Sequence, residues 1–169
     1  ELQTRPSPSA TVIWLHGLGA GGYDFVPVVR ELQELGAPAG RFVFPHAATM
    51  PVTINGGAVM RAWYDIVNVD LLRREDEKGI RASQQQVEAL IAREAERGVA
   101  RSRIVLAGFS QGGAIALQAA LRHPQRLAGV MALSTYLPLQ QTLAAEASPA
   151  NRDVPILMAH GTKDPLIPL

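Results

Sequence analysis

The sequence predicts one α/β domain spanning residues 1–169, in which a mostly parallel sheet carries helices on both faces. Two observations support this prediction. Short apolar runs rich in β-branched residues alternate with segments of helical period along the chain. Strands that alternate with helices are usually joined by crossovers and therefore run parallel. Three of the runs end in glycine-marked turns, at residues 16–22, 108–113 and 160–165.

The composition argues against several classes of protein. With 47% hydrophobic residues, 18% charged residues and a net charge of +1, the chain has no electrostatic reason to bind nucleic acid or an anionic membrane. The absence of cysteine excludes disulfides, thiolate metal sites and a cysteine nucleophile. No apolar run approaches the ~20 residues that span a bilayer, so we expect no stable membrane insertion and a cytoplasmic location.

The first third of the chain predicts a strand, a helix and a second strand. Residues 11–15 form a continuous apolar run, as expected for a strand that is buried on both faces. A helix should begin with Asp24 as its N-cap, tolerate Pro27 in its first turn and end at Gly36. Residues 41–45 form the second short strand.

The pattern loosens from residue 46 to about residue 79. Residues 55–57, Asn-Gly-Gly, are a strong turn signal, residues 63–66 suggest a short extended piece, and residues 73–78 form a solvated charge run. Beyond this segment the alternation resumes. We expect helices at residues 80–97, 114–121 and 138–147, and strands at residues 103–107, 127–133 and 155–159.

Residues 108–113, Gly-Phe-Ser-Gln-Gly-Gly, contain the Gly-x-Ser-x-Gly pattern between a predicted strand and a predicted helix. This context is typical of a nucleophile elbow, a sharp strained turn that lifts a serine hydroxyl above the end of a sheet. Glycines two residues before and after Ser110 keep β-carbons out of the place where the chain doubles back. The pattern therefore predicts Ser110 as a catalytic nucleophile.

The loop at residues 17–22 allows two interpretations. It matches the dinucleotide fingerprint G-x-G-x-x-G between a strand and a helix. The fingerprint also requires an acidic residue at the end of the second strand, and residues 44–47 contain none. We therefore favour an oxyanion loop, in which the backbone N–H groups of Leu18 and Gln111 face a developing alkoxide.

Asp164 follows the last predicted strand and precedes Pro165. A carboxylate at this point is often a surface turn residue. Its position after the serine elbow nevertheless fits the order Ser, Asp, His of some hydrolytic triads. We therefore predict a functional role for Asp164.

The segments at residues 16–19, 108–113 and 160–165 together resemble the phospholipase/carboxylesterase family. This is the α/β-hydrolase group of small bacterial carboxylesterases and acyl-protein thioesterases. Residues 52–66 and 132–136 resemble its bacterial carboxylesterase branch, so the likeness covers nearly the whole chain.

The resemblance implies an α/β-hydrolase fold and a role for each matching residue. Ser110 would be the nucleophile, Asp164 the acid of the triad, and Leu18 and Gln111 the source of the oxyanion N–H groups. The region around Trp63 would line the acyl pocket. No cofactor and no metal are implied, and because members often pair, a homodimer is left open.

The family also carries a histidine on a loop beyond the acid, which serves as the general base. No histidine follows Asp164. We therefore expect the sequence to stop before the C-terminal helix-strand-helix portion and the histidine loop. The 169 residues would then be insufficient for catalysis.

The four histidines of the chain are poor substitutes for this base. His123 lies 13 residues past Ser110, which is roughly 20 Å along a helix. His16 and His160 end strands, and we expect them to hold the loops by hydrogen bonds. Nothing in the sequence orients His46.

The leading hypothesis is a serine carboxylester hydrolase that acts on small to medium apolar acyl esters through an acyl-serine intermediate. Acyl-protein thioesters and lysophospholipids remain alternative substrates, because one acyl-enzyme serves them all. The alternative from another class is a catalytically incompetent fragment or binding module that keeps the fold but lacks the triad histidine.

Overall fold

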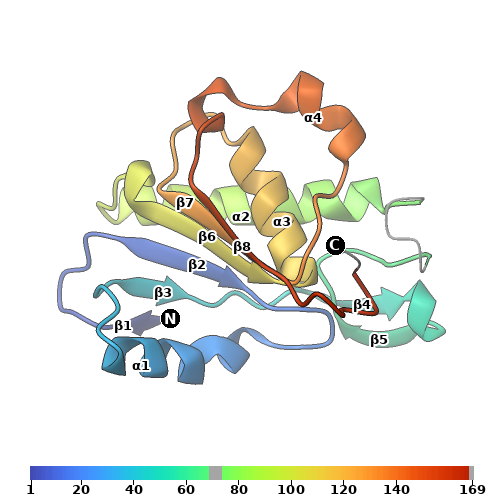
Figure 1. The fold of residues 1–169 in the computed structure, drawn as a ribbon, viewed down its shortest axis with the longest axis horizontal. Coiled ribbons are helices and arrows are strands. Elements are labelled where there is room, and N and C mark those ends of the chain that lie inside the picture. The colour runs from blue at the N-terminus through green and yellow to red at the C-terminus, as the bar shows by residue number, and fades with distance from the viewer. Residues whose placement is uncertain (69–73, 168–169) are drawn as a thin grey trace.

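The computed structural model describes residues 1–68 and 74–167, and a six-stranded sheet forms its centre (Figure 1). The strand order is β1-β3-β2-β6-β7-β8, and every neighbouring pair except β1 with β3 is parallel. The mostly parallel sheet predicted from the sequence is therefore confirmed. Its strands are β1 (Leu2–Gln3), β2 (Thr11–Leu15), β3 (Arg41–Val43), β6 (Ile104–Phe109), β7 (Gly129–Leu133) and β8 (Ile156–Ala159).

Helices cover both faces of the sheet, as the alternating pattern predicted. The helices are α1 (Val26–Glu34), α2 (Glu77–Glu96), α3 (Gln111–Arg122) and α4 (Gln140–Glu146). On one face Ile13 and Leu15 pack in a core that includes residues of α2 and α3. On the other face their neighbour Trp14 packs with Val29 of α1, because successive side chains of a strand point to opposite faces.

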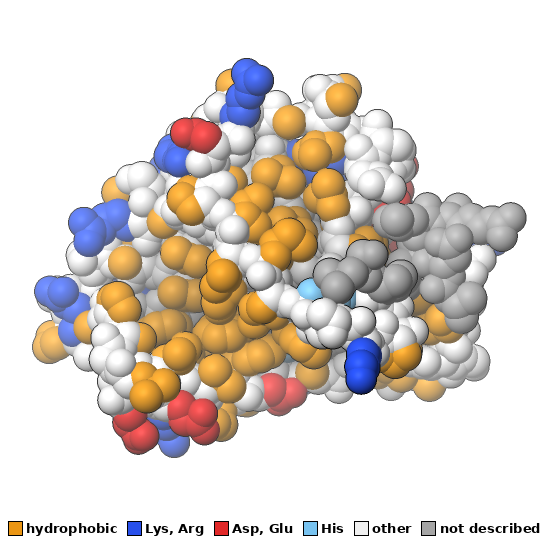
Figure 2. Space-filling view, in the orientation of Figure 1, with side chains coloured by type: hydrophobic (Ala, Val, Ile, Leu, Met, Phe, Trp, Pro, Cys, Tyr) orange, Lys and Arg blue, Asp and Glu red, His pale blue; other side chains and the backbone are white. Residues whose placement is uncertain are grey.

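The covering of the sheet is uneven. Every residue of β8 is exposed, and Leu157 and Met158 keep 60% and 58% of their surface accessible. Apolar side chains accordingly gather on the face shown in Figure 2, which has the orientation of Figure 1. No helix in the described ranges is both long and apolar enough to cross a bilayer.

The segment between β3 and α2 contains a hairpin that the sequence pattern did not predict. Strands β4 (Thr49–Val52) and β5 (Ala58–Arg61) pair antiparallel across the 3-10 turn η2 (Thr53–Asn55) and the left-handed Gly56 and Gly57. The turn at 55–57 was therefore predicted correctly, but the strands were not. Pro51 within β4 argues against a strand, and only an edge position in this two-stranded sheet accommodates it.

Helix starts also differ from the prediction: α3 begins three residues early, at Gln111, and α4 two residues late, at Gln140. Asp24 is not the N-cap of α1, because it lies inside the short 3-10 helix η1 (Gly22–Phe25), and Phe25 occupies the cap. Helix α2 begins at Glu77, three residues early, because Asp76 caps it by accepting a hydrogen bond from the Gly79 N–H at 3.0 Å. Of the predicted charge run 73–78, residue 73 lies outside the described residues.

Candidate active site

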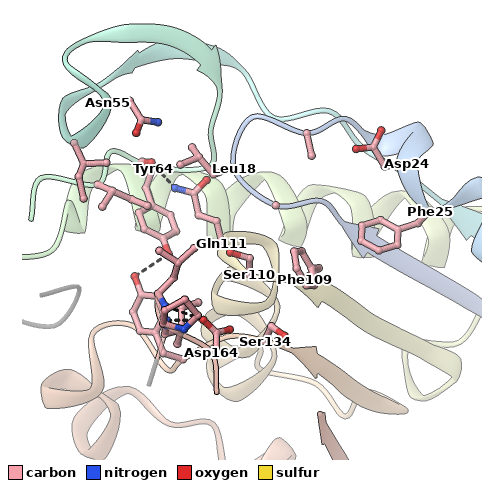
Figure 3. Close-up of a pocket in the computed structure, with 18 residues that line it drawn as sticks. Leu18, Asp24, Phe25, Asn55, Tyr64, Phe109, Ser110, Gln111, Ser134 and Asp164 are labelled. Atoms are coloured by element: carbon pink, nitrogen blue, oxygen red, sulfur yellow. Dashed lines mark hydrogen bonds between the residues drawn. The ribbon is translucent and has the colours of Figure 1, made fainter. Parts of the chain in front are cut away.

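The parallel register brings the three glycine-marked loops to one edge of the sheet. Leu15 at the end of β2 pairs with Gly108 of β6, and Leu133 at the end of β7 pairs with both Phe109 and Ala159. The loops that follow these strands therefore lie side by side. They enclose a cavity of about 680 Å³ whose wall includes Leu18, Ser110, Gln111 and Asp164 (Figure 3).

Ser110 occupies a strained backbone conformation between β6 and α3. Its φ is 53° and its ψ is −123°, which costs on the order of 1–3 kcal/mol for a residue with a β-carbon. The surrounding chain holds this conformation through both peptide groups of the serine. The Ser110 N–H donates to the Leu133 carbonyl at 2.9 Å, and the Ser110 carbonyl accepts from the Thr135 hydroxyl at 2.7 Å.

The glycines on both sides of Ser110 are required by close approach. A β-carbon on Gly108 would lie 2.3 Å from the Gly112 backbone, and one on Gly112 would lie 2.3 Å from the Leu15 carbonyl oxygen. One on Gly113 would lie 2.7 Å from the Thr135 side chain. These distances are inside van der Waals contact, so the predicted role of the elbow glycines matches the structure.

His16 orients the first loop from a fully buried position. Its Nε2 accepts a hydrogen bond from the Ala47 N–H at 3.0 Å, so its Nδ1 carries the proton and donates to the Gly17 carbonyl at 2.7 Å. Burial lowers the pKa of His16, which favours this neutral form. Because carbonyl and N–H of a trans peptide point in opposite directions, the Leu18 N–H is directed away from His16.

The N–H groups of Leu18 and Gln111 are free to bind a ligand. Within residues 1–68 and 74–167, neither N–H has a hydrogen-bond acceptor. The two loops that carry them are in contact, since a β-carbon on Gly17 would lie 3.5 Å from the Cβ of Ser110. Unpaired N–H groups of two residues that line the same cavity as a serine are what an acyl-transfer site needs for its oxyanion.

The Gln111 side chain performs a second task that the sequence did not reveal. Its amide oxygen accepts from the Trp63 N–H at 2.8 Å, and its amide nitrogen donates to the Tyr64 carbonyl at 2.7 Å. Gln111 is only 2% exposed, so both bonds are shielded from water. They attach the segment after β5 to the first residue of α3.

Trp63 lies behind the cavity wall rather than in it. The indole is 4% exposed and its N–H donates to the His16 carbonyl at 2.8 Å. Trp63 is thus not among the lining residues, whereas Tyr64 and Ile66 of the same segment are. The resemblance implied that the region around Trp63 lines an acyl pocket. Two residues of this region contact the cavity, and the Trp63 side chain itself does not.

Much of the remaining wall is apolar or aromatic. Phe109 precedes Ser110 directly, and Ser134 and Tyr136 follow β7 at the same sheet edge. Their position after a parallel strand is the signal that could have identified them from the sequence. The larger side chains of this kind include Phe25, Ile54, Tyr64, Ile66, Phe109, Tyr136, Leu166 and Ile167.

Asp164 reaches the cavity from the loop after β8. One carboxylate oxygen accepts from the Leu166 and Ile167 N–H groups at 2.9 and 3.0 Å, and these bonds lower the pKa of Asp164. The other oxygen lies 3.6 Å from His160 Nε2. Asp164 is therefore an ionised carboxylate at neutral pH on the same cavity as Ser110.

No histidine of the described residues lines the cavity. His160 Nε2 is bound to the Ile167 carbonyl at 2.7 Å, which agrees with the loop-holding role expected for His16 and His160. His46 accepts from the Gly22 N–H at 3.1 Å. His123 is buried at the far end of α3.

Comparisons with known proteins find similar sequences and similar folds. The sequence profile of the phospholipase/carboxylesterase family matches residues 3–169. Acyl-protein thioesterase 1 of Cryptococcus neoformans is 39% identical over 170 aligned positions, which cover 99% of this chain and 71% of the relative. Among solved structures, Arabidopsis thaliana SOBER1 has a TM-score of 0.86 at 31% identity, over 95% of this chain and 77% of that one.

A second solved structure, Zea mays acyl-protein thioesterase 2, has a TM-score of 0.80 at 28% identity. It covers 99% of this chain and 77% of that one. These likenesses confirm the α/β-hydrolase fold predicted from the sequence motifs.

Proposed function

The chain belongs to the phospholipase/carboxylesterase family, and from this premise we propose that it is a serine hydrolase that cleaves small to medium apolar carboxylic esters. One observation carries the proposal. A strained serine and two free backbone N–H groups share the wall of one apolar cavity. A backbone strained in this way is retained where the surrounding structure enforces it, which is typical of functional sites.

In the proposed reaction the Ser110 hydroxyl attacks the acyl carbonyl carbon. The carbonyl oxygen becomes an alkoxide that accepts hydrogen bonds from the Leu18 and Gln111 N–H groups, each contributing about 3 kcal/mol. The alkoxide collapses, the C–O bond breaks, and the alcohol leaves with the serine proton, which a base has carried to it. Water then attacks the acyl-serine, releases the acid and restores Ser110.

Asp164 is assigned to orient and stabilise an imidazolium base. Its carboxylate lines the cavity and is ionised at neutral pH, as this task demands. Because no described histidine faces the cavity, the serine is best tested with imidazole as an external base.

The experiment compares the chain with Ser110→Ala and, as a matched control, with Ser134→Ala, a second serine of the same cavity. With p-nitrophenyl butyrate and imidazole, the chain and Ser134→Ala should release p-nitrophenol above the imidazole background, and Ser110→Ala should not. A fluorophosphonate should modify Ser110 under the same conditions. If the three proteins match the background, the hydrolase proposal fails.

A thioesterase is the second candidate, because a relative 39% identical to this chain bears that name. The acyl-serine intermediate is common to ester and thioester cleavage, so only the rates separate them. Comparing matched butyryl ester and butyryl thioester substrates measures this preference directly. A chain that binds apolar ligands without any Ser110-dependent turnover would instead be a binding module.

A further inference from the structure

Two tyrosines meet in the wall of the cavity. The hydroxyls of Tyr64 and Tyr136 lie 2.8 Å apart and form one hydrogen bond (Figure 3). Tyr64 follows β5 and is 2% exposed, while Tyr136 follows β7 and is half-buried. Both line the same cavity as Ser110, so the bond joins two segments that are 72 positions apart at the ligand site.

The pair has one hydroxyl proton more than it uses. Each neutral phenol carries one proton, and a single hydrogen bond between two hydroxyls consumes only one of them. Among the described residues, neither hydroxyl has another partner. One O–H donor is therefore left at the wall of an otherwise largely apolar cavity, where an unpaired donor is costly.

The surroundings keep both phenols protonated. Burial is the main cause that raises the pKa of both phenols, that of Tyr136 to about 12 and that of Tyr64 well above its ordinary value, and the nearby Glu75 carboxylate adds to both effects. Glu75 itself is held in place, because it accepts a hydrogen bond from the Leu139 N–H at 2.9 Å. A negative charge beside the pair disfavours an anionic ligand atom and leaves a neutral acceptor as the suitable partner.

We propose that Tyr64 and Tyr136 form a polar subsite that donates one hydrogen bond to a neutral ether or carbonyl oxygen in the chain of the bound ligand. This subsite rests on the proposed function, since it assumes that the cavity holds the ester. It adds a selection among esters. Replacing a methylene of the acyl or alkoxy chain by oxygen lowers its hydrophobicity. Esters with such an internal oxygen should nevertheless bind more tightly than this loss of hydrophobicity alone predicts.

The test uses ketones, which imitate esters without being hydrolysed. Nonan-2-one is compared with a series in which one chain methylene is replaced by an ether oxygen at successive positions. Dissociation constants are measured by calorimetry for the wild-type chain, the double variant Tyr64→Phe/Tyr136→Phe, and Tyr23→Phe. Tyr23 is the matched control, because it is 68% exposed and does not line the cavity.

For each ether ketone we take the ratio of its affinity to that of nonan-2-one. For one position of the oxygen this ratio should be roughly fivefold higher in the wild-type chain than in the double variant, the value expected of a single hydrogen bond. Tyr23→Phe should behave as the wild type. If this affinity ratio is the same in the double variant as in the wild-type chain at every oxygen position, the subsite is overturned while the hydrolase proposal remains intact. If the wild-type chain binds no ketone at all, the apolar-ester function fails and the subsite fails with it.

Discussion

The side-chain amide of Gln111 donates a hydrogen bond to the carbonyl oxygen of Tyr64 at 2.7 Å. The two residues are 47 positions apart and belong to different parts of the site. The bond links the residue after the serine to the cavity wall, so the position of the wall and that of the elbow are mechanically connected. A single glutamine thus supplies a backbone donor and a structural clamp.

Gln111→Met should destabilise the chain substantially. The substitution conserves volume but leaves two buried backbone groups, at Trp63 and Tyr64, without partners. At about 1–3 kcal/mol for each unsatisfied group, we expect a loss of about 2–6 kcal/mol in the free energy of unfolding. Urea denaturation measures it, with the exposed Gln85→Met of α2 as control. Equal midpoints for the two variants would contradict the clamp.

Gly112→Ala should disrupt the elbow. The added methyl would lie 2.3 Å from the Leu15 carbonyl oxygen, and backbone atoms of a central strand cannot move aside as a flexible side chain could. We expect a loss of about 3 kcal/mol or more in stability. Gly161→Ala is the matched control, since its β-carbon would meet nothing closer than 4.0 Å. Thermal unfolding of both variants distinguishes steric conflict from a general intolerance of alanine.

Leu18→Pro isolates one proposed oxyanion donor. The Ala20 N–H donates to the Gly17 carbonyl, and Gly19 has a φ of 72°, so Leu18 is the second residue of a turn that accepts proline at this place. Proline removes the N–H without requiring another backbone shape. We expect the Ser110-dependent ester hydrolysis with imidazole to fall roughly 100-fold or more, with little change in melting temperature.

Leu18→Ala, which keeps the N–H, should retain most of this activity. A proline variant as active as the alanine variant would show that the Leu18 N–H does not contact the oxyanion.

His123 should make the fold sensitive to acid. It is 6% exposed, neither ring nitrogen has a partner among the described residues, and burial lowers its pKa below the ordinary 6.5. The unfolded chain therefore takes up a proton first as the pH falls. Stability is lost from about pH 6.5 down to the lowered pKa of the folded state.

His123→Leu removes this proton uptake. Between pH 7 and pH 5 the variant should lose less stability than the wild type, while between pH 8 and pH 7 the difference between the two should stay constant. Urea titrations at the three pH values measure the difference. Parallel pH profiles would show that acid acts through other groups, of which His16 is the next candidate because burial lowers its pKa as well.

Local patterns identified most of the elements. Residues 11–15 were predicted as a strand with the bounds that β2 has, because a continuous apolar run before glycines is unambiguous. The β4–β5 hairpin was missed because Pro51 and the lack of alternation hide its strands. The Asp24 cap was misplaced because a carboxylate before a helical pattern cannot reveal an intervening 3-10 turn.

The sequence by itself determined the sheet class, the family resemblance and the candidate chemistry around Ser110. These depend on short-range features, namely hydrophobic period, glycine spacing and the residues beside the serine. Only the tertiary structure decided which side chains meet across the cavity. Gln111 with Tyr64, and Tyr64 with Tyr136, are pairs from distant segments, and such contacts follow from strand register and loop path rather than from any local pattern.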